Sequence, residues 1–148
     1  MAVKKQEYQS VGIRFAALLL DGIILLVVNL LIVLPVVGLG FFNILFAVVV
    51  FLPIIILIIV VDFLYFVLLE GLYGATIGKR AVGICVVRED GSKCTITDAF
   101  IRNLLRIVDG ILCYLIGAIL IWTSEKKQRI GDMAAHTIVV RSVDKVKR

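Results

Sequence analysis

Residue types that build metal sites and disulfide frameworks are scarce in this 148-residue sequence. His136 is the single histidine, and Cys85, Cys94 and Cys113 show neither C-x-x-C spacing nor a paired arrangement. These counts argue against a zinc site and a disulfide scaffold, and they indicate free thiols in a reducing compartment or in lipid. The sequence also shows no nucleophile–base pair and no metal-ligand spacing, so we expect neither enzymatic activity nor a cofactor.

Charged residues are also few, at 18% of the chain, whereas hydrophobic residues make up 61% and the mean hydropathy is +1.10. Apolar runs of about 20 residues at such a composition are typical of a membrane protein. The net charge of +5 comes mainly from bases outside those runs. This placement favours contact with a lipid bilayer carrying anionic headgroups, and we expect no nucleic-acid partner. The length suits one domain over residues 1–148.

Two long apolar segments predict membrane-spanning helices over about residues 12–37 and 41–69. The first carries Asp21 and Asn29 in its interior, and Pro35 and Gly38-Leu39-Gly40 are expected to end it. Asn29 is expected to form an interhelical hydrogen bond. Pro53 predicts a bend near the middle of the second, in which Asp62 is the only charge. The short, uncharged connection predicts a tight helical hairpin.

The one substantial polar segment, residues 70–98, predicts a small β-hairpin over about residues 81–96. Residues 81–87 are β-branched and apolar, Asp90-Gly91 is a turn signal, and residues 93–96 would form the return strand. Thr97 is then expected to cap the third helix.

The third helical region is predicted over about residues 98–122, with Trp122 at interface depth and a basic tail over residues 123–148. Two topologies remain open for it. It could cross the membrane fully, or form an interfacial helix and a re-entrant hairpin bent near Gly110 or Gly117. The second is favoured because it keeps the basic tail in the cytoplasm. The expected fold is an all-α membrane bundle of about three hydrophobic helices with a small cytoplasmic β-hairpin, multi-pass in the cell membrane.

A short internal repeat links two distant segments. Residues 77–87 (I-G-K-R-A-V-G-I-C-V-V) align without gaps with residues 130–140 (I-G-D-M-A-A-H-T-I-V-V). The repeat predicts that both segments dock in a similar way, as paired strands on one membrane face. Within it, Lys79 and Arg80 beside Gly78 are expected to contact lipid headgroups.

Ionisable residues inside the apolar segments are the candidate functional site. Arg102, Arg106 and Asp109 share one helical face, and helical rise places three aspartates about 10–12 Å below one membrane surface. A cluster of this kind is either an intramembrane site for a proton or cation, or a structural clamp of paired charges. The candidate residues are Arg14, Asp21, Asp62, Arg102, Arg106 and Asp109.

The ordered motifs resemble the RDD family of small prokaryotic membrane proteins, which is named for an arginine and two aspartates. The matching stretches are R-F-A-A-L-L-L-D (14–21), T-I-G-K-R-A-V-G-I-C-V-V (76–87), R-N-L-L-R-I-V-D (102–109) and Q-R-I-G-D-M-A-A-H-T-I-V-V (128–140). The resemblance marks Gly78, Lys79, Gly131 and Asp132 as motif positions. His136 departs from the expected glycine, and Asp62 matches no signature position. The resemblance implies an integral inner-membrane protein, with sodium/proton antiport ascribed to some members.

Two functions are expected from these observations. The first is transport of a monovalent cation or proton, resembling sodium/proton exchange. Three short helices hardly enclose a pathway, so transport would require a homo-oligomer. The second is a non-transporting adaptor or scaffold that binds a partner or anionic lipid through the hairpin and the basic tail.

Overall fold

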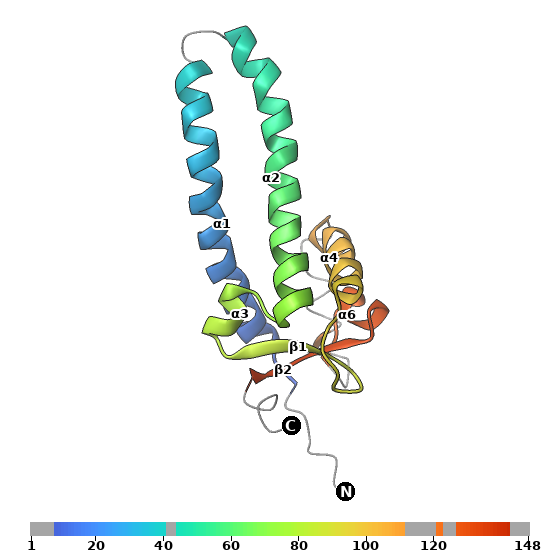
Figure 1. Cartoon of the computed structure of the whole chain (residues 1–148). Coiled ribbons are helices and arrows are strands. Elements are labelled where there is room, and N and C mark those ends of the chain that lie inside the picture. Colours follow the sequence, from blue (N-terminus) through green and yellow to red (C-terminus); the bar gives the residue numbers. More distant parts are fainter. Residues whose placement is uncertain (1–7, 41–43, 112–120, 123–126, 143–148) are drawn as a thin grey trace, which may run out of the picture.

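Two long helices stand side by side in the computed structural model, which describes residues 8–40, 44–111, 121–122 and 127–142 (Figure 1). Helix α1 spans Val11–Gly40 and helix α2 spans Ile44–Tyr73. The predicted helix end is right at the glycines, because α1 ends at Gly40, but wrong at Pro35, which lies inside the helix. A membrane helix tolerates the loss of the one backbone donor that proline lacks. The predicted tight connection after residue 37 is helical up to Gly40, Pro53 lies inside α2, and residues 41–43 lie outside the described residues.

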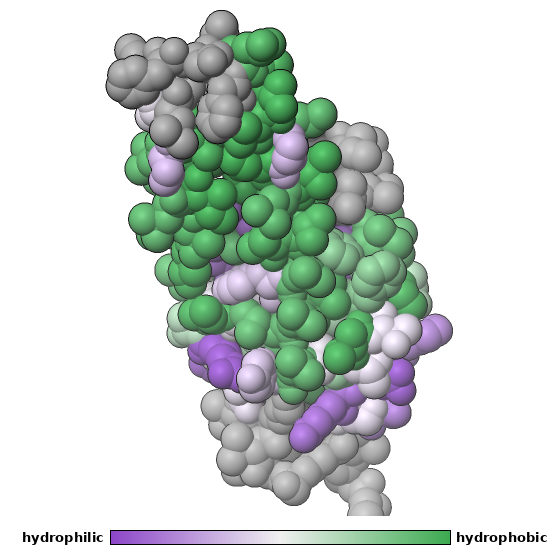
Figure 2. Space-filling model, turned by 45° about the horizontal axis from the view of Figure 1, so that its top comes forward, coloured by the Kyte–Doolittle hydropathy of each residue, from purple (hydrophilic) through white to green (hydrophobic). Residues whose placement is uncertain are grey.

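The surfaces of α1 and α2 are apolar and largely exposed. Both helices are long and apolar enough to cross a membrane, and the most apolar window of α2 has no buried residue. Large side chains such as Leu31 and Leu45 are 70% and 72% exposed. On the face that Figure 2 shows, hydrophobic residues cover the long helices and hydrophilic residues gather toward one end. Continuous apolar exposure on this scale marks a surface for lipid or protein, so both helices are candidate membrane spans.

The remaining described elements gather at one end of the two long helices (Figure 1). They form a cap, which comprises α3 (Ile77–Ala81), β1 (Ile84–Arg88), α4 (Ile96–Ile111), α6 (Ile130–Ala134) and β2 (Thr137–Arg141). Strands β1 and β2 pair antiparallel, from Ile84 opposite Arg141 to Arg88 opposite Thr137. The paired strands that the internal repeat predicts are therefore confirmed.

The predicted hairpin over residues 81–96 is wrong in its second strand. The first strand exists as β1, but residues 93–96 contribute only an isolated bridge between Val87 and Lys93. The turn closes through the Arg88 amide, which donates to the Ser92 carbonyl oxygen at 3.0 Å. Residues 137–141 pair with β1 in place of residues 93–96 because they form a continuous apolar, β-branched strand that is buried together with β1.

Both faces of the two-stranded sheet are covered. One face packs with helical residues into a core of Ala17, Val67, Ile84, Val86, Cys94, Ala99 and Val139. The other forms a smaller core of Ala75, Cys85, Val87, Ile138 and Val140, against which Tyr8 packs. A strand buried on both faces reads as an unbroken apolar run, which explains the Val-Val pair in each half of the repeat.

Helix α4 begins at Ile96, one residue before the predicted cap Thr97. Thr95 and Asp98 form reciprocal bonds, in which the Thr95 amide donates to Asp98 Oδ2 at 2.9 Å and the Asp98 amide donates to Thr95 Oγ1 at 3.2 Å. This capping box makes Thr95 the N-terminal cap in place of Thr97. Helix α4 continues through Gly110 to Ile111, and the predicted bend at Gly117 lies outside the described residues.

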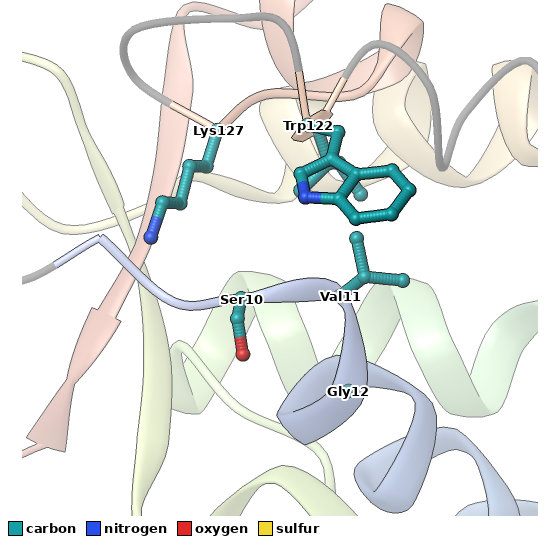
Figure 3. Close-up of a pocket in the computed structure, with 6 residues that line it drawn as sticks. Ser10, Val11, Gly12, Trp122 and Lys127 are labelled. Atoms are coloured by element: carbon teal, nitrogen blue, oxygen red, sulfur yellow. The ribbon is translucent and has the colours of Figure 1, made fainter.

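Both ends of the segment from Ile96 to Trp122 lie at the capped end of the long helices. Ile96 is packed against Gly71 near the end of α2. Trp122 lies beside Val11 at the start of α1, with its indole ring next to the valine side chain (Figure 3). The two described ends of this segment therefore lie at the same end of the molecule.

The two copies of the internal repeat adopt the same local structure. Each has a five-residue helix, α3 or α6, then a residue with positive φ and then a strand. Gly83 has φ +72° and His136, at the matching position, has φ +48°. The left-handed turn is thus retained although histidine replaces glycine there, and histidine is among the residues that adopt this conformation more readily than most.

Candidate functional site

Asp132 brings the two signature arginines together in the cap. Its carboxylate is buried at the start of α6, accepts a hydrogen bond from Arg14 Nη1 at 2.7 Å and lies 3.2 Å from Arg102 Nη2. Arg14 donates further to the carbonyl oxygens of Gln9 and Lys127. Residues from α1, α4 and α6 therefore meet at one carboxylate.

Glu70 extends this arrangement from the end of α2. Its Oε2 atom lies 3.3 Å from Arg102 Nε and accepts from Asn103 Nδ2 at 3.1 Å, while its Oε1 atom pairs with Lys79 Nζ. Arg102 thus lies between two buried carboxylates. We call Arg14, Glu70, Lys79, Arg102 and Asp132 the charge network. It ties α1, α2, α3, α4 and α6 to one another.

The electrostatics of the charge network favour fixed charges. Burial alone would raise the pKa of Asp132, but Arg102, Arg129 and Arg14 outweigh it and hold that pKa well below its usual range. Burial would likewise lower the pKa of Arg102, yet Asp132 and Glu70 raise it overall. Lys79 differs, because burial lowers its pKa to about 8 and Glu70 offsets only part of that effect. The network is therefore better suited to holding helices together than to releasing protons.

Two glycines let the short helices approach the long ones. A side chain at Gly78 would clash with the Ala17 carbonyl oxygen of α1. A methyl group at Gly131 would lie 2.7 Å from the Arg102 carbonyl oxygen of α4. Each short helix thus docks on a longer helix through the glycine at the same position of the repeat, and the residue after that glycine, Lys79 or Asp132, enters the charge network.

Asp21 holds α3 against α1 through hydrogen bonds from neutral donors. It is 1% exposed and accepts from Tyr65 Oη at 2.7 Å, Thr76 Oγ1 at 2.6 Å and the Gly78 amide at 2.7 Å. Thr76 caps α3 in turn by accepting from the Lys79 amide at 3.3 Å. The carboxylate is fully engaged, which favours a positioning role for Asp21 over ion exchange.

Asp62 has fewer hydrogen-bond donors than the two other described carboxylates of α1 and α2, Asp21 and Glu70. It lies within α2, and Asn29 Nδ2 of α1 donates to its two oxygens at 3.3 and 3.2 Å, which agrees with the interhelical bond expected of Asn29. No other described residue donates to Asp62, and the buried Asn29 Oδ1 atom has no hydrogen-bond partner among the described residues. The Asn29 amide and the Asp62 carboxylate thus face each other between the long helices, and Asn29 Nδ2 is the donor that joins them.

A groove of about 610 Å³ opens beside Asp62 between α2 and α4. Its walls are mostly apolar, and Asp62, Asn103 and Arg106 supply the polar groups. The Arg106 guanidinium lies 3.9 Å from the centre of the Phe66 ring. We call this feature the lateral groove. Asn103, which lines the groove together with the half-buried Asp62, donates a hydrogen bond to the network residue Glu70.

A second pocket of about 380 Å³ lies where α1 begins. Ser10, Val11 and Gly12 line it from one side, and Trp122 and Lys127 line it from the other (Figure 3). Trp122 is 88% exposed. An exposed indole beside a lysine at the end of an apolar helix has the character of a membrane-interface anchor.

The structure separates residues that the sequence placed in one cluster. Arg14 and Arg102 meet at Asp132. Asp21 instead holds α3 against α1. Asp62 and Arg106 line the lateral groove. The side chain of Asp109 lies outside the part that the structure describes. The predicted headgroup contact of Lys79 is wrong, because its ammonium group is buried against Glu70. This pairing avoids the cost of an isolated buried charge.

Sequence reasoning missed four contributors to the site, namely Glu70, Thr76, Asn103 and Arg129. For Glu70 the sequence does offer a signal. A carboxylate at the end of an otherwise apolar helix, nine residues before Lys79, is a usable signal for a buried ion pair. Asn103 carries no such signal, because its bond to Glu70 depends on how α4 docks against α2.

This fold and site define a class of protein in which a long apolar helical hairpin is joined to a small cap by buried arginine–carboxylate pairs. The model of the RDD family matches residues 8–136, and the chain belongs to this family of membrane proteins. It is 36% identical over 91 residues to the "Uncharacterized protein YxaI" of Bacillus subtilis (strain 168). That match covers 61% of this chain and 59% of the relative, so the chain spans about three fifths of its length. No solved structure shows a significant match.

Proposed function

We propose that this protein is a multi-pass protein of the cell membrane that moves a proton or a monovalent cation, with Asp62 as the exchanging carboxylate. The observation that carries the proposal is the environment of Asp62. It lies in the span of α2, faces the lateral groove and receives hydrogen bonds from Asn29 alone among the described residues. Ionisable residues at such positions mark ion pathways more often than they serve packing.

The chemistry of the Asn29–Asp62 pair suits exchange between a proton and a cation. A proton on Asp62 would supply the donor that Asn29 Oδ1 lacks. A monovalent cation would instead be held by the carboxylate and amide oxygens, which are the ligand type that hard cations prefer. The buried carboxylates of Glu70 and Asp132 are already paired with basic side chains, and that of Asp21 already accepts three hydrogen bonds.

We propose that the cap lies in the cytoplasm. Strand pairing keeps β1 and β2 at one end of the long helices, and Trp122 lies beside Val11 at that same end. The cap carries many bases, and loops rich in lysine and arginine stay on the cytoplasmic side. A reporter fused after Arg148 should be active only in the cytoplasm, and activity outside the cell would reject this orientation.

A homo-oligomer is part of the proposal. The lateral groove is open, and the described helices of one protomer do not surround Asp62. The outer faces of α1 and α2 are apolar and available for packing within the membrane. A second copy packed over the groove would enclose the carboxylate and exclude lipid from it.

Transport can be tested with purified protein in liposomes that contain a pH-sensitive dye. An imposed sodium gradient should change the internal pH with wild-type protein and with Asp90→Asn, a control in an exposed turn that removes the same charge. Asp62→Asn should abolish the change while Cys94 stays protected from thiol reagents, which reports an intact cap. No sodium-dependent change with folded wild-type protein, or an unchanged signal from Asp62→Asn, would overturn the proposal.

The second candidate is a non-transporting adaptor that binds anionic lipid. The exposed Trp122 beside Lys127 favours it (Figure 3). It is the weaker candidate because β1 and β2 are almost wholly buried and offer little free surface for a partner. Binding to anionic vesicles with no ion movement would favour the adaptor.

A further inference from the structure

A small, partly open cavity lies where most elements of the structure meet. It has a volume of about 30 Å³ and is lined by residues of α1, α2, α3, α4 and β2 and of the segment before α6. Four of its lining residues are bases and one is an acid: Arg14, Lys79, Arg106 and Arg129 against Asp21. This central cavity shares Phe66 and Arg106 with the lateral groove, but Asp62, the proposed exchange residue, lines only the groove.

Among the residues that the structure describes, the positive charges around the central cavity outnumber the negative ones. Arg106 stacks on Phe66, and even without it the bases Arg14, Lys79, Arg102 and Arg129 outnumber the acids Asp21, Glu70 and Asp132 by four to three. Arg102 and Lys79 share Glu70, and Arg102 and Arg14 share Asp132. Asp21 lines the cavity, but its hydrogen bonds come from three neutral donors, and it forms no ion pair with the described bases. An uncompensated buried positive charge is costly.

Arg129 is the base with the weakest partner. Its nearest carboxylate oxygen, Asp132 Oδ2, is 3.9 Å away, and its guanidinium donates no hydrogen bond to any described residue. Its side chain is only 20% exposed. Burial is the largest cause of the lowered pKa of Lys79, and the positive charges of Arg102 and Arg129 lower it further.

We propose that the central cavity binds one small inorganic anion of the size of chloride, held by Arg129 together with Arg14 and Lys79. The volume sets the class of ligand, because a single water needs about 10–15 Å³ and the cavity offers about twice that space. A phosphoryl headgroup or an organic anion is too bulky. The bound anion neutralises the excess charge and links the segment before α6 to α1 and α3.

The test measures stability and needs no ion gradient, so its result is independent of the transport proposal. The protein is placed in nanodiscs of phosphatidylcholine, and sodium chloride replaces sodium gluconate at constant ionic strength. Thermal unfolding is followed by the exposure of the Cys94 thiol. Chloride should raise the unfolding temperature saturably, with bromide as a substitute. At a chloride concentration ten times Kd, the unfolding equilibrium should shift about elevenfold.

Arg129→Gln should abolish the chloride effect, and Arg80→Gln should retain it, because Arg80 lies in the same cap but is exposed and stacks on Tyr73. Broadening of the chlorine NMR line by wild-type protein gives a second measure that does not depend on the folding of any variant. Equal stability in chloride and gluconate, or an equal chloride effect in Arg129→Gln, would overturn the proposal. Stabilisation only after phosphatidylglycerol is added would also overturn it and would show that the basic residues bind an anionic lipid headgroup instead.

Discussion

Replacing Asp132 with asparagine should destabilise the cap by about 3 kcal/mol, the lower end of the range for breaking a buried ion pair. The change keeps the shape of the side chain but removes the charge shared by Arg14 and Arg102. Arg14 retains two backbone carbonyl acceptors and Arg102 retains Glu70, so neither is left wholly unpaired. This residual pairing is why we expect the lower end of the range.

The free energy of cap opening can be read from the reactivity of the buried Cys94 thiol, quantified by mass spectrometry of its peptide. Asp90→Asn is the matched control and should lie within about 0.5 kcal/mol of wild type, as surface substitutions do. The double variant Asp132→Asn/Arg14→Gln should lose less than the sum of the single variants, because each removes the partner of the other. A loss below about 0.5 kcal/mol for Asp132→Asn would refute the role given to the charge network.

Three further outcomes are expected. Gly131→Ala should destabilise the protein by about 1–3 kcal/mol in thermal unfolding because it clashes with α4, whereas Gly22→Ala, with open space around it, should be neutral or stabilising. Burial raises the pKa of Cys94 to about 11, so its alkylation at pH 8 should be about a hundredfold slower than in the unfolded chain, and equal rates would contradict this. The hydrogen bond from Arg88 lowers the pKa of Asp98 to about 2. The ionised Asp98 carboxylate should therefore stabilise the fold fully above about pH 4 and lose this effect toward pH 2. Asp98→Asn should flatten that part of the pH–stability curve.

The sequence predicted the membrane helices well because their signal is local. Unbroken apolar runs predict α1 and α2 without knowledge of any partner. The strand pairing was predicted from the internal repeat, since two segments of like sequence are expected to dock alike. The hairpin partner was predicted wrongly because a local turn signal at Asp90-Gly91 competes with a distant strand, and packing decides between them.

The site was harder to predict than the fold. Helical spacing placed Asp21, Asp62 and Asp109 at one depth, but depth does not determine direction around a helix axis. In the structure Asp21 faces α3, whereas Asp62 faces Asn29 and the lateral groove. The partners of the arginines depend on where α6 docks, and no local pattern in the sequence encodes that docking.

The bond between Arg14 and Asp132 joins residues 118 positions apart, and this has a consequence for biosynthesis. At about 5–20 residues per second, Asp132 is synthesised roughly 6–24 s after Arg14. Throughout that interval Arg14 lacks its carboxylate partner, and it joins the charge network only after α6 has been synthesised. A nascent chain halted before α6 would therefore have both long helices and an unfinished cap without Asp132.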